Sequence, residues 1–154
     1  MEELQSQEKF VNWIRPNVQA ERTEIARTLI KFLNVEPTDK NVGKIIETIE
    51  VAAISELTED EWEKLDNTES FHGVRVGHLE DAEQITEKHN QYLSRGYQRN
   101  VGVLADALRD GKEMEAPVIL KNEKGETHLV SGNTRLMVAR ALGIQPQVIV
   151  VEFK

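Results

Sequence analysis

The chain has 154 residues, no cysteine, 39% apolar residues and a formal net charge of −8 at pH 7. This length suits one domain, or a small domain with a helical appendage, and the absence of cysteine excludes disulfides, zinc–thiolate sites and thiol catalysis. No apolar run approaches the roughly 20 residues that span a bilayer, and the acidic, polar N-terminus is unlike a secretory signal. We expect a cytoplasmic protein without a membrane segment.

The acidic surplus lies in the first half of the chain. Residues 1–70 contain 16 acidic and 8 basic residues, whereas residues 71–154 contain 11 of each. Proteins that bind duplex DNA through contacts with many phosphates are usually basic. Strong nonspecific DNA binding is therefore not expected, although a few local cations in the neutral second half suffice to hold a nucleotide.

Helical spacing of apolar residues dominates the first seventy residues. It predicts three helices, over residues 10–14, 16–34 and 42–54. Thr58 and Glu61 have the spacing of a capping box, so a fourth helix is predicted to run through Leu65. Residues 66–70 have the composition of a linker.

Strands and helices are mixed in the second half. Apolar or β-branched runs predict strands over residues 74–76, 117–120, 127–130 and 148–151. Amphipathic spacing predicts helices over residues 82–92, 101–108 and 133–142. The order indicates an α+β or α/β domain over residues 71–154, preceded by an acidic helical region over residues 1–70.

The most informative stretch is the turn Ser131-Gly132-Asn133-Thr134-Arg135, where a strand ends at a glycine and a helix begins. The free N–H groups of the helix and its dipole attract an anion at such a turn, most simply a phosphate. Because the dipole opposes a cation in the first turn, the position of Arg135 favours a functional reason, such as a bidentate contact with phosphate. A salt bridge to an acidic neighbour is the alternative.

The other residues of the turn also have ordinary structural roles. Gly132 suits a backbone with positive φ as well as a close approach to phosphate. Capping of the following helix is the favoured role for Ser131 and Asn133, whereas Thr134 is equally suited to capping and to phosphate binding.

Three blocks of the second half, in order, resemble the ParB/sulfiredoxin-like superfamily, which is named from the chromosome-partitioning protein ParB and the redox enzyme sulfiredoxin. Tyr97-Gln98-Arg99 stands where ParB-like proteins have a Gln-(Pro)-Arg element. The second block is a leucine-rich helix, a glycine and a strand, at residues 104–108, 111 and 116–119. The third block runs from Gly125 to Arg140 and continues with Gly143 and residues 148–150. The resemblance covers about residues 71–154.

The resemblance implies an α+β fold, built as a small mixed-sheet domain, and the binding of a nucleoside triphosphate. Separately, Glu80, Asp81 and Glu83 are candidates to bind a hard cation such as Mg²⁺; carboxylates at a helix start that complement its dipole are the alternative. The implied nucleotide-binding residues are Gln98, Arg99, Gly132, Asn133, Thr134 and Arg135. ParB proteins commonly carry Gly-Glu-Arg-Arg at the turn and sulfiredoxin carries Gly-Cys-His-Arg, so Gly132 and Arg135 match both patterns. Because the chain has no cysteine, sulfiredoxin chemistry is excluded.

Three functions stay open. The first is a nucleotide-binding module in a DNA- or nucleotide-related process, whose acidic helices bind a protein partner or a second copy. The second is an enzyme on the same scaffold, a metal-dependent nuclease, nucleotide hydrolase or phosphotransferase, with Glu80, Asp81 and Glu115 as candidate carboxylates. The third is an interaction module in which the pocket has decayed and the acidic helices act on a basic partner.

Overall fold

Strands that are apolar at nearly every position form the middle of this fold, because such strands are buried on both faces of a sheet. The computed structural model describes residues 11–19, 21–65, 73–92 and 99–153. The larger sheet consists of β2 (Ser55–Glu56), β4 (Val118–Lys121), β5 (Thr127–Ser131) and β6 (Gln147–Glu152). Its order is β2–β6–β4–β5, with β4 parallel to β6 and antiparallel to β5. The fold is therefore α+β with a small mixed sheet.

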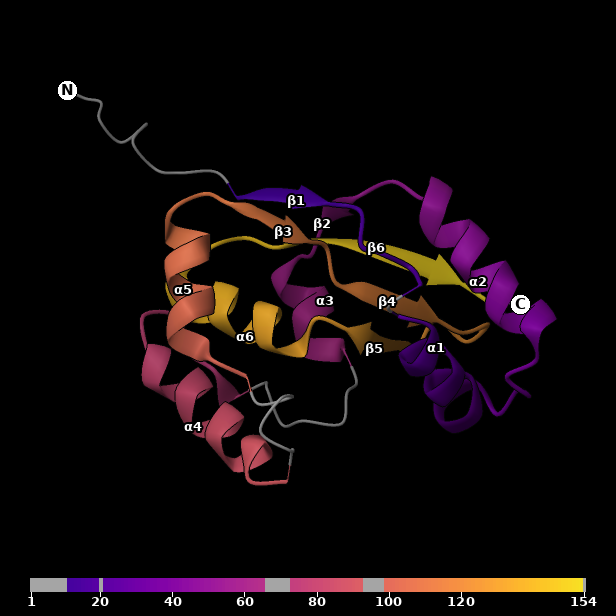
Figure 1. Ribbon diagram of the computed structural model, residues 1–154, viewed down its shortest axis with the longest axis horizontal. Helices are drawn as coiled ribbons and strands as arrows, with labels where there is room; N and C mark the ends of the chain where they lie inside the picture. The colour runs from indigo at the N-terminus through magenta and orange to yellow at the C-terminus, as the bar shows by residue number, and fades with distance from the viewer. Residues whose placement is uncertain (1–10, 20, 66–72, 93–98, 154) are drawn as a thin grey trace.

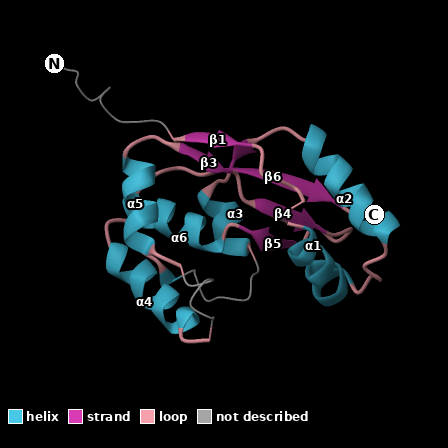
Figure 2. Cartoon of the chain, viewed as in Figure 1, coloured by secondary structure: helices cyan, strands magenta, loops and turns pink. Residues whose placement is uncertain are grey.

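Helices cover both faces of this sheet (Figure 1, Figure 2). One face carries α1 (Arg22–Thr28), the π-helical turn η2 (Leu29–Leu33) and α2 (Asp39–Val51). The other face carries α3 (Glu59–Lys64), α4 (Leu79–Asn90), α5 (Val101–Arg109) and α6 (Asn133–Leu142). None of the helices in the described ranges combines the length and the apolar composition of a membrane-spanning segment.

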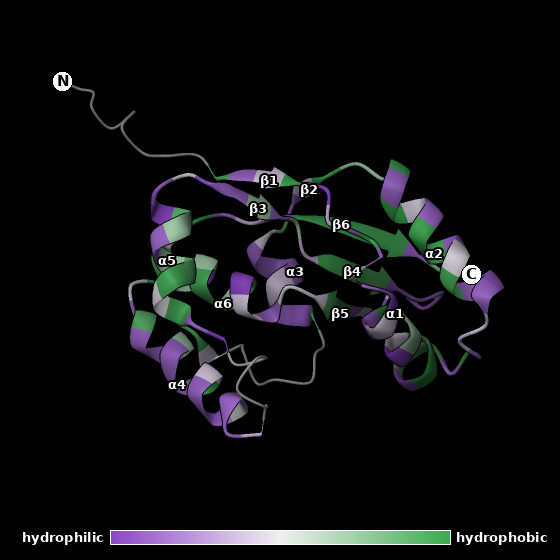
Figure 3. Cartoon of the chain, viewed as in Figure 1, coloured by the Kyte–Doolittle hydropathy of each residue, from purple (hydrophilic) through white to green (hydrophobic). Residues whose placement is uncertain are grey.

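Alternation of side chains along the strands divides the interior into two cores. In β4, Val118 and Leu120 belong to the core that contains Ile25 of α1, whereas Ile119 between them belongs to the core that contains Leu136 of α6. Figure 3 shows the central strands as apolar and the helices as striped with hydrophilic residues. The helices therefore turn their apolar stripes towards the interior, and α4 does so against α5 and α6.

A second sheet has two strands, β1 (Asn12–Ile14) and β3 (Glu113–Glu115), which pair in parallel. The prediction of a helix over residues 10–14 is wrong for residues 12–14; residue 10 lies outside the described residues. Trp13 is buried and pairs with Met114 across the two strands. This long-range pairing decides the conformation, because so short an apolar run has no period that separates a strand from a helix.

Local capping signals account for the helices that the sequence predicts correctly. In α3, the Thr58 hydroxyl accepts a bond from the Glu61 N–H at 3.2 Å and the Glu61 carboxylate accepts from the Thr58 N–H at 2.9 Å, so the predicted capping box is confirmed. The helices predicted at residues 42–54, 82–92, 101–108 and 133–142 are observed as α2, α4, α5 and α6. The helix predicted from residue 16 begins only at Arg22.

Residues 74–76 do not form the predicted strand. The Arg75 backbone N–H donates to the Asp81 carboxylate at 3.0 Å, and its guanidinium nitrogens Nε and Nη2 donate at 2.9 and 3.1 Å. This fork holds the segment as a turn that leads into α4. The short strands β2 and β3 are largely polar, which is why no apolar run marks them, and the predicted linker at residues 66–70 lies outside the described residues.

Strands from the first seventy residues complete both sheets. β1 pairs with β3, and β2 pairs in antiparallel fashion with β6. Both cores also combine residues from before and after residue 70. The described part of the acidic helical region therefore shares its packing with the rest of the chain.

Leu29 and Ile30 are neighbours in η2 with opposite environments, 0% and 54% exposed. Leu29→Ala is expected to lower the free energy of unfolding by about 2–5 kcal/mol because it empties a buried site, and Ile30→Ala by about 0.5 kcal/mol or less. Urea denaturation followed by tryptophan fluorescence measures both effects. Equal losses in the two variants would contradict the packing of η2 on the sheet.

Candidate anion-binding site

The turn between β5 and α6 begins with an irregularity in the sheet. Val118 of β4 lies opposite Ser131, but the next residue, Ile119, lies opposite Leu129. Val130 is therefore an extra residue in β5, a β-bulge, and bulges redirect the side chains that follow them. The bulge sets the direction in which Ser131 enters the turn.

Gly132 lets the backbone turn sharply against Pro117. Its φ is 97°, in the left-handed region, and a Cβ built on it would lie 2.7 Å from Cβ of Pro117. The same position lies 3.0 Å from Nη2 of Arg135, so the guanidinium folds back over the turn. The prediction that Gly132 adopts a positive φ is confirmed, and the contacts with Pro117 and Arg135 leave no room for a side chain.

The N-terminus of α6 has no side-chain cap. The N-cap residue is Gly132, whose carbonyl accepts a bond from the Leu136 N–H at 2.9 Å. The predicted capping roles of Ser131 and Asn133 are therefore wrong, because these residues lie one position to either side of the cap. The N–H groups of the first helical residues, 133–135, precede the first intrahelical bond and point out of the helix end.

Four polar side-chain atoms at this turn are buried without a hydrogen-bond partner among the described residues. They are Ser131 Oγ, Asn133 Oδ1, Thr134 Oγ1 and Arg135 Nε. Buried polar atoms in proteins are nearly always hydrogen-bonded, and leaving one unpaired costs about 1–3 kcal/mol. Their concentration on four of the five residues from 131 to 135, at a helix N-terminus, marks a place where a ligand would supply the missing partners.

Two carboxylates lie close enough to interact with the charge of Arg135. Glu21 is the residue immediately before α1, and Glu115 is the last residue of β3. Burial lowers the pKa of Arg135, and Glu21 and Glu115 act in the opposite direction. Among the described residues, no carboxylate forms an ion pair with Arg135, and Glu21 and Glu115 act on it through their charge. The alternative of a salt bridge to an acidic neighbour stays open.

Glu21 is 9% exposed, which is low for a carboxylate. Burial raises its pKa, Arg135 lowers it and Glu115 raises it again. The Ser131 hydroxyl makes no well-formed hydrogen bond but lies near enough to lower the pKa of Glu21 slightly. For both Glu21 and Arg135, the loss of hydration thus shifts the pKa more than the attraction of the opposite charge does.

The sequence does not single out Glu21, because it falls inside the helix predicted over residues 16–34. The one local signal is its position just before the true start of α1. It reaches the turn because α1 packs against β5.

Of the two residues predicted to assist from the preceding segment, Arg99 is described and Gln98 lies outside the described residues. Asn90 Oδ1 accepts a bond from the Arg99 N–H at 2.9 Å, and Asn90 Nδ2 donates to the Arg99 carbonyl at 2.8 Å. These two hydrogen bonds join the end of α4 to Arg99, the residue that precedes Asn100, the N-cap of α5. The nucleotide-binding roles of Arg99 and Gln98 stay predictions.

Two of the three carboxylates considered for an enzyme have local partners. The Arg75 fork holds the pKa of Asp81 at about 2. A hydrogen bond from its own backbone and a contact with His78 at 2.9 Å lower the pKa of Glu80. The third carboxylate, Glu115, lies near the turn. In the described ranges, no group of three His, Asp or Glu side chains is arranged to hold a metal ion.

No family model, curated protein or solved structure matches this chain. Function is therefore inferred from the chemistry of the turn, which combines donors on α6 and Arg135 with acceptors on Glu21 and Glu115.

Glu21 should make stability depend on pH. Its pKa in the folded protein lies above the unfolded value, so the charged form costs stability at neutral pH and the cost disappears below the ordinary value of 4.5. Glu21→Gln is expected to raise the urea midpoint at pH 7, and this gain should shrink towards zero below about pH 4. Glu36→Gln, at an exposed loop residue, is the control. A gain from Glu21→Gln that is equal at both pH values would contradict the burial of a charge.

Proposed function

We propose that the turn from Ser131 to Arg135 binds the phosphate of a nucleotide, in a protein of the ParB/sulfiredoxin-like type that acts in a DNA- or nucleotide-related process. Gly132, Asn133, Thr134 and Arg135 form the binding turn, and Arg99 and Gln98 contribute from the segment before α5. The small mixed sheet and the order strand, glycine turn, helix support this assignment.

The set of unpartnered polar atoms carries the proposal. The N–H groups at the start of α6, the Thr134 hydroxyl and the Arg135 guanidinium are donors, and the oxygens of one phosphate accept several such bonds together. Rotation of the Asn133 side chain exchanges its amide oxygen and nitrogen, so this residue can also donate. A phosphate at the turn would satisfy buried groups that have no partner among the described residues.

The two carboxylates bear on the form in which a nucleotide binds. Glu21 and Glu115 place two negative charges against the single positive charge of Arg135, so a bare phosphate dianion meets repulsion as well as attraction. Mg²⁺ in proteins is usually held by one or two carboxylates together with substrate phosphates. Glu21 and Glu115 suit that role, and we expect the nucleotide to bind as its Mg²⁺ complex.

Removal of the guanidinium tests the proposal. Arg135→Gln is expected to weaken nucleoside triphosphate binding about ten- to a hundredfold, since a hydrogen bond to a charged group contributes about 1.5–3 kcal/mol. Thr134→Val removes a hydroxyl that makes no bond within the described residues, so it should weaken binding without loss of stability. Calorimetric titrations with and without Mg²⁺ measure both.

Arg109→Gln is the matched control, because Arg109 is exposed at the end of α5 and pairs only loosely with Asp106, at 3.7 Å. Its affinity should equal that of the unmodified protein. The proposal fails if Arg135→Gln binds as tightly as this control, or if the unmodified protein shows no binding up to about 10 mM nucleotide.

A second candidate function, a metal-dependent nuclease, nucleotide hydrolase or phosphotransferase, is favoured by Glu21. A carboxylate with a raised pKa beside a phosphate site is a candidate proton acceptor. Time courses with nucleotide or DNA, in Mg²⁺ and in EDTA, test this function. An enzyme should lose turnover in EDTA and in Glu21→Gln while Glu21→Gln still binds nucleotide; binding without any turnover in the unmodified protein identifies a binding module.

The acidic helices keep their predicted role in association with a protein partner or a second copy. α1 and α2 turn apolar faces to the sheet. Exposed acidic residues such as Glu47 and Glu50 lie on α2. A basic partner is the one such a face would favour.

A further inference from the structure

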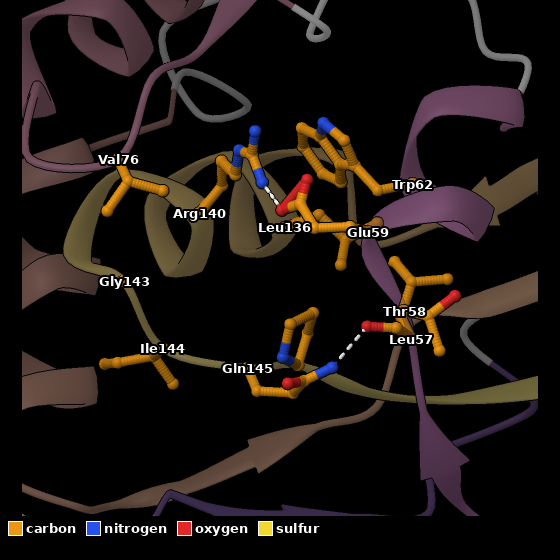
Figure 4. A pocket seen from close by; sticks show the side chains of 11 residues that line it. Leu57, Thr58, Glu59, Trp62, Val76, Leu136, Arg140, Gly143, Ile144 and Gln145 are labelled. Carbon is orange, nitrogen blue, oxygen red and sulfur yellow. Dashed lines mark hydrogen bonds and ion pairs between the residues drawn. The ribbon is translucent and has the colours of Figure 1, made fainter.

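A separate cavity lies beside α6, and none of the residues with unpartnered atoms at the turn lines it (Figure 4). Its volume is about 230 Å³, and its lining comes from the start of α3, from Leu136 and Arg140 of α6, from Val76 and from the segment Gly143 to Pro146. Most of its lining is apolar, from Leu57, Trp62, Val76, Leu136 and Ile144. The volume lies below the range of about 300–1,000 Å³ that suits drug-sized ligands, so a ligand here would be small.

Hydrogen bonds between its walls hold the cavity open. The Leu57 N–H donates to the Pro146 carbonyl at 3.0 Å, and Gln145 Nε2 donates to the Leu57 carbonyl at 2.6 Å. These bonds join the segment before α3 to the segment before β6. Two walls of the cavity are thus fixed relative to each other by hydrogen bonds.

One wall carries a positive charge with a fixed position. The Arg140 side chain is 21% exposed, its Nε donates to the Val74 carbonyl at 3.3 Å, and its guanidinium lies over the Trp62 ring at 5.4 Å from the ring centre. Figure 4 shows Arg140 and Trp62 side by side at one end of the cavity, with Glu59 reaching towards them. The contacts with Val74 and Trp62 fix the guanidinium independently of Glu59. A guanidinium fixed in this position is preorganised to bind a carboxylate.

The present carboxylate partner of Arg140 is easily replaced. Glu59 forms an ion pair with Nη1, but its side chain is 68% exposed and it lies at the first position of a short helix. Ion pairs with so exposed a partner contribute little to stability. A ligand carboxylate that also buries an apolar body would gain hydrophobic contact that Glu59 does not make.

We propose that this cavity binds a small monocarboxylate with a compact apolar body. The carboxylate takes the place of Glu59 on the Arg140 guanidinium, and the apolar body fills the space between Leu136, Ile144 and Val76. The Arg140 guanidinium and the unpartnered atoms of the turn belong to different sites, although the Leu136 side chain lines the cavity and its N–H closes the turn.

The test uses 4-methylpentanoate and benzoate as probes, with 4-methylpentanamide and benzamide as neutral counterparts. Titrations followed by calorimetry and by the indole N–H resonance of Trp62 should show saturation near or below about 1 mM for at least one acid, and at least tenfold weaker binding of its amide. Glu59→Gln should tighten binding of the acid several-fold, because it removes a competing carboxylate. Arg140→Gln should weaken it tenfold or more.

Two substitutions with matched controls separate the cavity from other sites. Val76→Phe enlarges a side chain that lines the cavity and is 57% exposed, so it should weaken binding, whereas Val51→Phe, at 81% exposed on α2, should not. Glu63→Gln on the outside of α3 should leave the affinity unchanged, and so should Arg135→Gln, which shows that the acid does not bind at the turn.

The opposite effects of Glu59→Gln and Arg140→Gln keep the proposal open to refutation even if loss of Arg140 disturbs the fold. It is overturned if neither acid binds up to about 10 mM, if acid and amide bind equally, or if Glu59→Gln leaves the affinity unchanged or weakens it.

Discussion

Burial of one positive charge beside two negative charges is the feature on which the candidate site depends. Arg135 is folded back over Gly132, Glu21 is placed by the start of α1, and Glu115 is placed by the pairing of β3 with β1. In this arrangement desolvation has a larger effect on the pKa of Arg135 and of Glu21 than the attraction between their charges has. Groups held in this way are common at sites that bind a charged ligand, because the ligand restores the interactions that burial has removed.

The two-faced sheet makes this meeting of charges possible. Because β4 is covered on both sides, residues before and after it are brought together: α1 on one face and α6 on the other both approach the end of β5. The β-bulge at Val130 and the contact of Gly132 with Pro117 then turn the chain from the sheet into α6 at the same place. α6 also has two regions of chemical interest, since its N-terminus forms the turn and its C-terminal half borders the cavity at Arg140. Leu136 belongs to both, because its N–H closes the turn and its side chain lines the cavity.

The main part of the candidate site is predicted from a short segment of sequence. A β-branched run, a glycine and an amphipathic stretch are enough to predict strand, turn and helix, and the helix end and Arg135 follow from them. Which polar groups of the turn find hydrogen-bond partners is less predictable. Ser131 and Asn133 have the residue types of N-caps, but the cap falls on Gly132, and their polar atoms are left without partners in the described structure. Which residue occupies the cap depends on the bulge in β5, and the bulge depends on pairing with β4.

The sequence by itself determined the elements whose ends are set by neighbouring residues: the capping box of α3, the amphipathic helices α2, α4, α5 and α6, and the strands β4 and β5. Only the tertiary structure decided that residues 12–14 form a strand, that Arg75 binds Asp81 instead of joining a sheet, and that Glu21 lies beside Arg135. The physical reason is the range of the interactions. Caps and helical periodicity act over three or four residues, so they can be read locally. Strand pairing and the burial of a charge depend on partners that are distant along the chain, and these become neighbours only when both cores have formed.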